Sequence, residues 1–169
     1  MFRAAEGEED SLEAGIADIS SHGVGDKDVL IGISVAGGAA YVVAALKEAA
    51  RRGATTVALT SNPDAPISRV ADITIFTDTG AEVITGSTRL KAGTAHKMVL
   101  NMITTSAMAK TGKVYENMMI NLRPSNIKLT ARMVRIVTEI LGCDESRAKE
   151  LLDKGEWSIK RAVEIAKNG

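Results

Sequence analysis

The stretch Val29-Leu-Ile-Gly-Ile-Ser-Val-Ala-Gly-Gly38 decides the fold of this chain. It opens with a short apolar run between turn residues, which is typical of a strand buried on both faces of a parallel sheet. A loop of small residues follows and leads into a helix that we expect to run to Arg52 and to stop at Gly53. The stretch therefore predicts the first strand, loop and helix of an α/β fold.

The same pattern continues on both sides of this unit. Residues 56–60 and 73–77 are strand-like runs joined by a loop that contains two prolines. Short connections between strand, helix and strand favour right-handed parallel units. Upstream, residues 6–23 predict a short amphipathic helix that stops near Gly23. We therefore predict an α/β core whose parallel strands follow the order of the chain.

A longer helix is predicted from Thr94 to Lys110. A helix that is apolar around most of its circumference is buried, either in a large core or at a subunit interface. In a chain of 169 residues an interface is favoured, and we expect a homodimer or a larger assembly. The apolar residues that cover this helix are Met98, Val99, Leu100, Met102, Ile103 and Met108.

The C-terminal part predicts only helices. One runs from Asn126 to Ile140 and ends at Gly142, and two shorter ones follow near residues 144–154 and 157–167. The two short helices are too small to form a core alone, so we expect a small helical appendage. The predicted domains are residues 1–120, the α/β part, and residues 121–169, the helical region.

Composition narrows the class of partner. The chain has 21 basic and 21 acidic residues and only 3% aromatic residues, which argues against nucleic acid and favours a small polar ligand. Cys143 is the only cysteine and there are only two histidines, so we expect neither a disulfide nor metal catalysis. An acidic start and short apolar runs predict no signal peptide and no membrane span, and hence a cytoplasmic protein.

The loop Ser34–Gly38 is the first candidate binding site. It leaves the carboxyl end of a predicted parallel strand, where α/β folds place ligands, and it opens a helix whose N–H groups suit an anion. Glycines such as Gly37 let the backbone approach a phosphate closely. The alternative is a tight strand-to-helix turn without a ligand.

The second candidate is the loop from Gly80 to Lys97. It gathers hydroxyl groups, three glycines, the basic side chains of Arg89 and Lys91, and the carboxylate of Glu82. Hydroxyls and cations suit phosphate oxygens, while a carboxylate suits sugar hydroxyls. The alternative is a solvated, capped loop whose basic side chains project into water.

The second loop also carries a family resemblance. Its residues 82–97, Glu-Val-Ile-Thr-Gly-Ser-Thr-Arg-Leu-Lys-Ala-Gly-Thr-Ala-His-Lys, resemble the signature segment of the N-acetylmuramic acid 6-phosphate etherases, a family with a sugar-isomerase (SIS) domain that is related to the glucokinase regulatory proteins of animals. The resemblance spans nearly all of the chain. Its other parts are residues 5–11, 100–102, 110–115, 126–129, Arg132, and Gly142 with Cys143.

The resemblance implies a cofactor-free lyase that cleaves the lactyl ether of N-acetylmuramic acid 6-phosphate to give N-acetylglucosamine 6-phosphate and D-lactate. The family's catalytic base matches Glu9, although acidic residues there also favour a helix N-terminus through the dipole. The implied phosphate contacts are nearest Ser34 and Ser87, and Asn126 and Lys128 are expected to reach a partner's pocket. The complete set of candidate binding residues is Ser34, Gly37, Glu82, Ser87, Thr88, Arg89, Lys91, Asn126 and Lys128.

Two departures from the family pattern keep three interpretations open. The family's first strand and first phosphate loop precede the segment at which this chain begins, so we expect a partial SIS sheet. Ala36, Ala39 and Ala40 replace a serine, a threonine and a proline of the family's second phosphate loop. The chain is then an impaired etherase, a sugar-phosphate sensor without turnover, or a piece that folds with a partner chain supplying the upstream strands.

Overall fold

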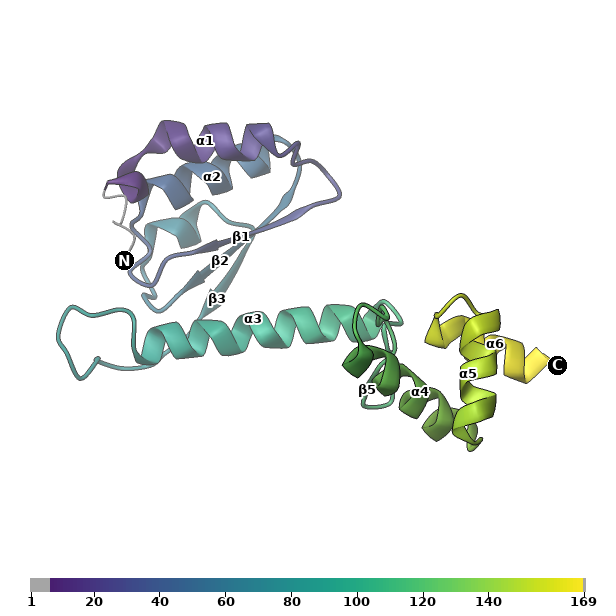
Figure 1. The fold of residues 1–169 in the computed structure, drawn as a ribbon. Helices are drawn as coiled ribbons and strands as arrows, with labels where there is room; N and C mark the ends of the chain where they lie inside the picture. The colour runs from purple at the N-terminus through teal and green to yellow at the C-terminus, as the bar shows by residue number, and fades with distance from the viewer. Residues whose placement is uncertain (1–6, 169) are drawn as a thin grey trace. The chain divides into compact units, whose positions relative to one another are not determined.

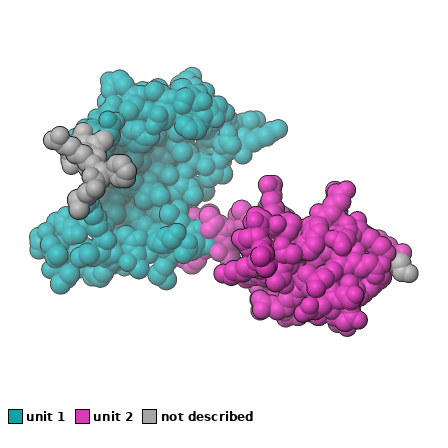
Figure 2. Space-filling view, in the orientation of Figure 1, with its two compact units in different colours: residues 1–101 teal, residues 102–169 magenta. Residues whose placement is uncertain are grey.

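The computed structural model describes residues 7–168 of the chain. They form two compact units, residues 7–101 and 102–168, which divide within helix α3 (Lys91–Lys110) (Figure 2). The domain boundary after residue 120 stays a prediction. No helix of the described part is long and apolar enough to cross a membrane.

Unit 1 is built on a three-stranded sheet of β1 (Val29–Ile33), β2 (Thr55–Thr60) and β3 (Ile73–Phe76) (Figure 1). All pairings are parallel and β2 lies in the centre. Gly32 lies opposite Ala58, and Ala58 lies opposite Thr74. The predicted α/β fold and its strand order are confirmed.

Two helices stack on one face of this sheet. Helix α2 (Ala40–Arg51) packs against β1 and β2, and α1 (Leu12–Ser21) packs on α2 (Figure 1). The two helices approach closely at Gly15, where a Cβ atom would lie 2.4 Å from the carbonyl oxygen of Tyr41. A glycine at this crossing therefore sets the distance between the helices.

The start of the chain differs from the predicted helix over residues 6–23. Residue 6 lies outside the described residues, and Glu8–Asp10 form a short 3-10 turn, η1, ahead of α1. Ser11 caps α1 by accepting a hydrogen bond from the backbone N–H of Ala14 at 3.1 Å. The cap ends the turn, because a residue that serves as N-cap has extended backbone angles. Glu9 is consequently held in a turn and not on a helix.

The prediction that β1 is buried on both faces is wrong. Only Gly32 of β1 is buried, and Val29 is 61% exposed. The central strand β2 is buried from Thr56 to Thr60, whereas the other edge strand, β3, leaves Ile73 50% exposed. An apolar run cannot distinguish a central strand from an edge strand, because burial at an edge depends on a neighbour. Both edges of the described sheet are thus apolar and open.

Helix α3 begins at Lys91, one turn earlier than predicted. The carboxylate of Glu82 accepts hydrogen bonds from the backbone N–H groups of Lys91 and Ala92, each at 3.0 Å. This cap satisfies two of the unpaired amides of the first turn and adds that turn to the helix. Among the described residues only Ala92 and His96 of α3 are buried, and Met98 is 60% exposed. The apolar surface on which the predicted homodimer depends is therefore present.

Unit 2 holds a small hairpin and three helices. The hairpin pairs β4 (Val114–Tyr115) with β5 (Met118–Met119), and α4 (Ile127–Leu141), α5 (Glu145–Lys154) and α6 (Ile159–Asn168) follow. As expected, α5 and α6 do not form a core by themselves, because α4 supplies the third side. The buried side chains of this core are Met133, Val134, Ile136, Val137, Ala148, Leu151, Leu152, Ile159 and Ala162.

The hairpin turn contains a strained residue and gives a first prediction. Glu116 is exposed and has a φ of 51°, a left-handed conformation that costs a residue with a side chain about 1–2 kcal/mol. Met118 packs against the helical core, so the hairpin and the core are linked. We expect Glu116→Gly to stabilise unit 2 by roughly 0.5–1 kcal/mol. Fluorescence of Trp157, the only tryptophan, measures this in urea.

The neighbouring position is the matched control. Asn117 lies in the same turn with a φ outside the positive range. Glycine there gains no relief of strain and adds freedom to the unfolded chain, so Asn117→Gly should lower the urea midpoint. Equal effects of the two substitutions would contradict the explanation by backbone strain.

Candidate functional site

A surface pocket of about 550 Å³ lies at the carboxyl end of β1. Four segments form it: the turn η1, the loop after β1, the start of α2 and the loop before α3. In parallel α/β sheets ligands bind at this end of the strands. The residues that line the pocket are Glu9, Asp10, Ile33, Ser34, Val35, Ala36, Gly38, Ala39, Val42 and Thr88.

The loop after β1 is held rigidly against the rest of unit 1. The N–H of Ser34 donates to the carbonyl of Leu59 at 3.1 Å, and the N–H of Gly37 donates to the hydroxyl oxygen of Ser34 at 3.1 Å. Because the Ser34 oxygen accepts this bond, its O–H can donate to a ligand. Gly37 has a φ of 77°, and a Cβ there would lie 2.2 Å from Cβ of Ala65.

The charge of the pocket is negative. Glu9 and Asp10 contribute carboxylates, and the described residues that line the pocket include no lysine and no arginine. A phosphate must then be held by hydroxyl and backbone N–H donors. Helix α2 begins beside the pocket, and within the described residues its N-cap, Ala39, provides no side-chain hydrogen bond to the first turn. The partial positive charge of that helix end favours an anion.

The second predicted loop contributes only Thr88 to this pocket. Glu82 is occupied as the cap of α3, and its hydrogen bonds from the N–H groups of Ala92 and Lys91 lower the pKa of its carboxyl. The oxygen of Ser87 accepts a hydrogen bond from the N–H of Arg89 at 3.4 Å, which shapes the loop itself. Glu82 and Ser87 are not among the residues that line the pocket.

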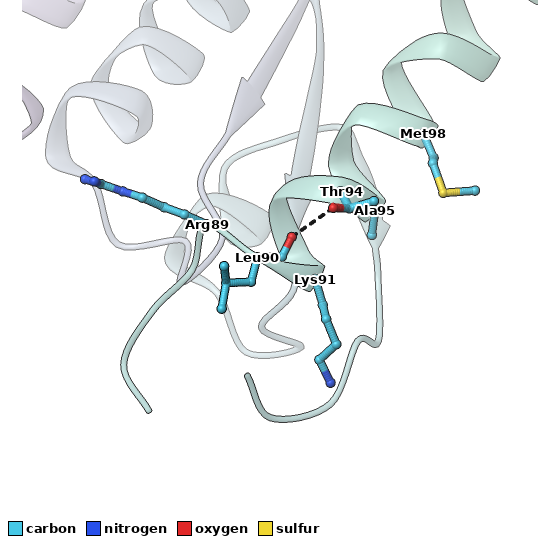
Figure 3. Close-up of a pocket in the computed structure, with 6 residues that line it drawn as sticks. All are labelled: Arg89, Leu90, Lys91, Thr94, Ala95 and Met98. Atoms are coloured by element: carbon cyan, nitrogen blue, oxygen red, sulfur yellow. Dashed lines mark hydrogen bonds between the residues drawn. The ribbon is translucent and has the colours of Figure 1, made fainter. Parts of the chain in front are cut away.

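Arg89 and Lys91 line a different, open depression of about 620 Å³ at the start of α3. Figure 3 shows that their side chains extend in different directions, while the hydroxyl of Thr94 donates to the carbonyl of Leu90 at 3.0 Å. Two cations that diverge do not form a common phosphate site. The structure thus brings together Glu9, Ser34 and Thr88 and leaves the two basic residues apart from them.

The two remaining candidates lie in unit 2. Asn126 is the N-cap of α4, and its side-chain oxygen accepts the backbone N–H of Leu129 at 2.9 Å. Lys128 is exposed on the first turn of that helix. The cap explains the asparagine without a ligand, and the contact of these residues with a partner's pocket stays a prediction.

Sequence reasoning missed a chain of polar contacts that includes a buried histidine. His96, which is 4% exposed, places Nε2 3.2 Å from the hydroxyl of Ser61, and this hydroxyl is 2.7 Å from that of Thr77. The chain connects α3 to the ends of β2 and β3. Its only sequence signal is a lone histidine on an apolar helix. No group of three or more potential metal ligands occurs in the described part of the chain.

The buried histidine predicts a pH dependence of stability. Burial lowers the pKa of His96 below its ordinary value, although the Thr60 carbonyl opposes this shift. In the unfolded chain the pKa of this histidine is about 6.5, so the unfolded chain binds more protons than the folded chain at mildly acidic pH. We expect the free energy of unfolding of unit 1 to fall as the pH drops through about 6.5 toward the lower pKa of the folded state.

Hydrogen exchange of the β2 amides at several pH values measures this effect. In His96→Gln the amide side chain keeps a polar partner for Ser61 but does not titrate, so the loss of stability in this window should disappear. The exposed His22, replaced in the same way, is the control and should leave the dependence unchanged. An unaltered pH profile in His96→Gln would assign the effect to other groups.

Comparison with known proteins agrees with this fold. The SIS domain family matches residues 13–106, which is more than half of the chain. The chain therefore belongs to the SIS domain family.

Individual relatives are more specific. The chain is 50% identical over 163 residues to the N-acetylmuramic acid 6-phosphate etherase of Symbiobacterium thermophilum, a match that covers 96% of this chain and 54% of that protein. It is 44% identical over 169 residues to the protein of the same name from Salmonella schwarzengrund, covering 100% of this chain and 57% of the relative. The chain spans about half the length of the curated relatives it matches.

Proposed function

We propose that the chain carries the catalytic base and part of the phosphate site of an N-acetylmuramic acid 6-phosphate etherase. One observation supports this most directly. The pocket at the end of β1 joins Glu9, Ser34 and Thr88 from three separate segments, and these are a carboxylate and two hydroxyls. The relatives named as etherases supply the substrate, which is a sugar phosphate.

The proposed reaction is an elimination followed by a hydration. The carboxylate of Glu9 takes the proton from the carbon next to the sugar aldehyde, and the electron pair of that C–H bond forms a carbon–carbon double bond. The ether C–O bond breaks, and D-lactate leaves with its bonding pair and takes up a proton. Water then adds across the double bond to give N-acetylglucosamine 6-phosphate. A positioned carboxylate contributes typically 10²–10⁴-fold to such a proton transfer.

Phosphate recognition falls to neutral donors. The O–H of Ser34 and the hydroxyl of Thr88 are polar side-chain groups of the pocket, and backbone N–H groups of the loop after β1 complete the set. Ala36 and Ala39 also line the pocket and offer no hydroxyl. Each absent hydrogen bond to a charged group is worth about 1.5–3 kcal/mol, so weak binding is expected.

A second function is favoured by the same two alanines. A sugar-phosphate sensor needs recognition without turnover, and a pocket with fewer phosphate donors suits a regulated, weak ligand. Glu9 has no task in this alternative. Release of D-lactate separates the two functions.

We also propose partners and a location. The exposed methionines of α3, among them Met98, support self-association into a homodimer. The open apolar edges of the sheet, at Val29 and Ile73, support pairing with strands supplied by an upstream segment or a partner chain. A cytoplasmic location fits a sugar-phosphate substrate.

The test combines binding with turnover. N-acetylmuramic acid 6-phosphate is titrated into the ¹⁵N-labelled chain, and amide shifts are expected in residues 34–38 and at Thr88. We expect no D-lactate from the 169-residue chain alone, and D-lactate from a chimera in which the upstream part of the Symbiobacterium relative precedes it.

Each outcome decides a separate claim. Shifts confined to other residues would reject the pocket. D-lactate from the 169-residue chain alone would reject its inactivity. A chimera that binds the substrate tightly and releases no D-lactate would favour the sensor.

A further inference from the structure

Two side chains outside the pocket hold its loop from behind. The hydroxyl of Thr60 donates to the carbonyl of Val35 at 3.0 Å, and the N–H of Ser61 donates to the same carbonyl at 3.0 Å. The side-chain amide of Asn62 donates to the carbonyl of Ala36 at 3.0 Å. Two consecutive carbonyls of the loop are therefore bound to residues at and just beyond the end of β2.

A third carbonyl is bound in the same way. Gly37 accepts from the backbone N–H of Ile67 at 3.1 Å. In a trans peptide the N–H of the next residue points opposite to the carbonyl, so the N–H groups of Ala36, Gly37 and Gly38 point away from these tethers. That of Gly37 reaches the Ser34 hydroxyl, while those of Ala36 and Gly38 have no hydrogen-bond partner among residues 7–168.

We propose that Thr60 and Asn62 are positioning residues, which aim the N–H groups of Ala36 and Gly38 into the pocket to receive an anionic group. The inference rests on the proposed function of this pocket. Neither positioning residue lines it, and Thr60 is 0% exposed, so both act through the loop. Because Thr60 and Asn62 lie at and just beyond the end of the neighbouring strand, the sequence alone does not reveal this role.

The negative charge of the pocket makes the orientation of these N–H groups important. With Glu9 and Asp10 in its lining and no cation there among the described residues, an anion depends on oriented dipoles. Successive backbone N–H groups that converge form an anion-binding concavity. Such dipoles strengthen binding only when they are already held in place before the ligand arrives. If the ligand has to order a mobile loop, the affinity for the ligand is lower.

Conservative variants separate positioning from folding. Asn62→Asp keeps the oxygen that accepts the N–H of Asp64 at 3.1 Å and loses the donor to the loop, but it also adds a negative charge. Asn62→Ser loses the same donor without adding a charge, so it is measured beside Asn62→Asp and the rise in Kd must appear in both. Thr60→Val keeps the buried branched shape and loses the hydroxyl, whereas Thr60→Ser keeps the hydroxyl and should rescue. Ser61→Ala is the control, since that hydroxyl contacts Thr77 and His96 and not the loop after β1.

The experiment follows backbone amides by NMR while inorganic phosphate, and separately N-acetylmuramic acid 6-phosphate, is added to the 169-residue chain. In the unaltered chain the largest shifts are expected at Ala36 and Gly38. The Kd should rise about tenfold in Asn62→Asp and in Thr60→Val. It should change less than about twofold in Thr60→Ser and Ser61→Ala. Hydrogen exchange of the β2 amides reports whether the fold is retained.

The outcomes distinguish this inference from the proposed function. An unchanged Kd in Asn62→Asp and Thr60→Val, or no phosphate shift at Ala36 and Gly38 of the unaltered chain, overturns the positioning role. If inorganic phosphate binds at these amides but the sugar phosphate binds no more tightly, the positioning role stands and the proposed function fails. Equal losses in Thr60→Ser and Thr60→Val would assign the effect to packing and overturn the role.

Discussion

Replacing Gly37 with alanine is expected to destabilise unit 1 by about 3 kcal/mol or more and to abolish ligand binding. The new Cβ would lie 2.2 Å from Cβ and 3.1 Å from Cα of Ala65, and neither atom can move without the backbone. The φ of 77° adds the cost of a left-handed alanine. The loop must then leave its tethers, and the pocket loses its shape.

The adjacent glycine is a control of the same chemistry. A Cβ atom at Gly38 would meet no other atom within 4 Å, and the φ of this residue lies outside the positive range. Gly38→Ala should leave stability unchanged or raise it by about 0.4–1 kcal/mol, although the added methyl lines the pocket. Hydrogen exchange of β2 measures both variants. Equal destabilisation by the two substitutions would show that Gly37 is not specially constrained.

Replacing Glu9 with glutamine is expected to lower the rate of D-lactate release in the chimera by roughly 10²–10⁴-fold. Glutamine keeps the size of the side chain and removes the basic oxygen, so substrate binding should change little. The expected result is a fall in kcat with KM nearly constant, because the lost interaction acts on the proton transfer alone. A coupled assay for D-lactate measures both constants.

Glu8 provides the matched control for this substitution. It lies beside Glu9 in the same turn, is exposed, and is not among the residues that line the pocket. Glu8→Gln makes the same change of charge and should leave kcat within about twofold. A similar loss in both variants would indicate a general effect of the negative charge of the turn.

Much of the fold could be predicted because its signals are local. The strand runs at 29–33, 55–60 and 73–76 are apolar and end at turn residues. The glycines that end the helices can also be recognised in the sequence itself. The exposure of Val29 could not be predicted, since it depends on which strand lies beside β1. The sequence likewise indicates Glu82 as a ligand residue. Its cap on the N–H of Lys91 spans nine positions of a loop, and a sequence pattern does not reveal such a contact.

The candidate site was predictable only in part. The resemblance pointed to Glu9, Ser34 and Thr88, and the structure places all three in one pocket. It pointed equally to Arg89, whose side chain lines a different depression. The direction of a side chain depends on the path of its loop, which the residue type does not predict. Thr60 carried no signal, since a buried threonine in a strand is ordinary until its hydroxyl is seen to hold another loop.

The pocket contains the carboxylates of Glu9 and Asp10, and its described lining has no cation. The affinity of the pocket for an anion should therefore depend on ionic strength in an unusual way. A phosphate site made of lysine or arginine weakens as salt is added, because mobile ions screen the attraction. Here the fixed charges repel the ligand and dipoles attract it at short range. Screening should therefore remove the repulsion first, and the affinity for a sugar phosphate should rise with an inert salt such as potassium chloride before ions compete for the site.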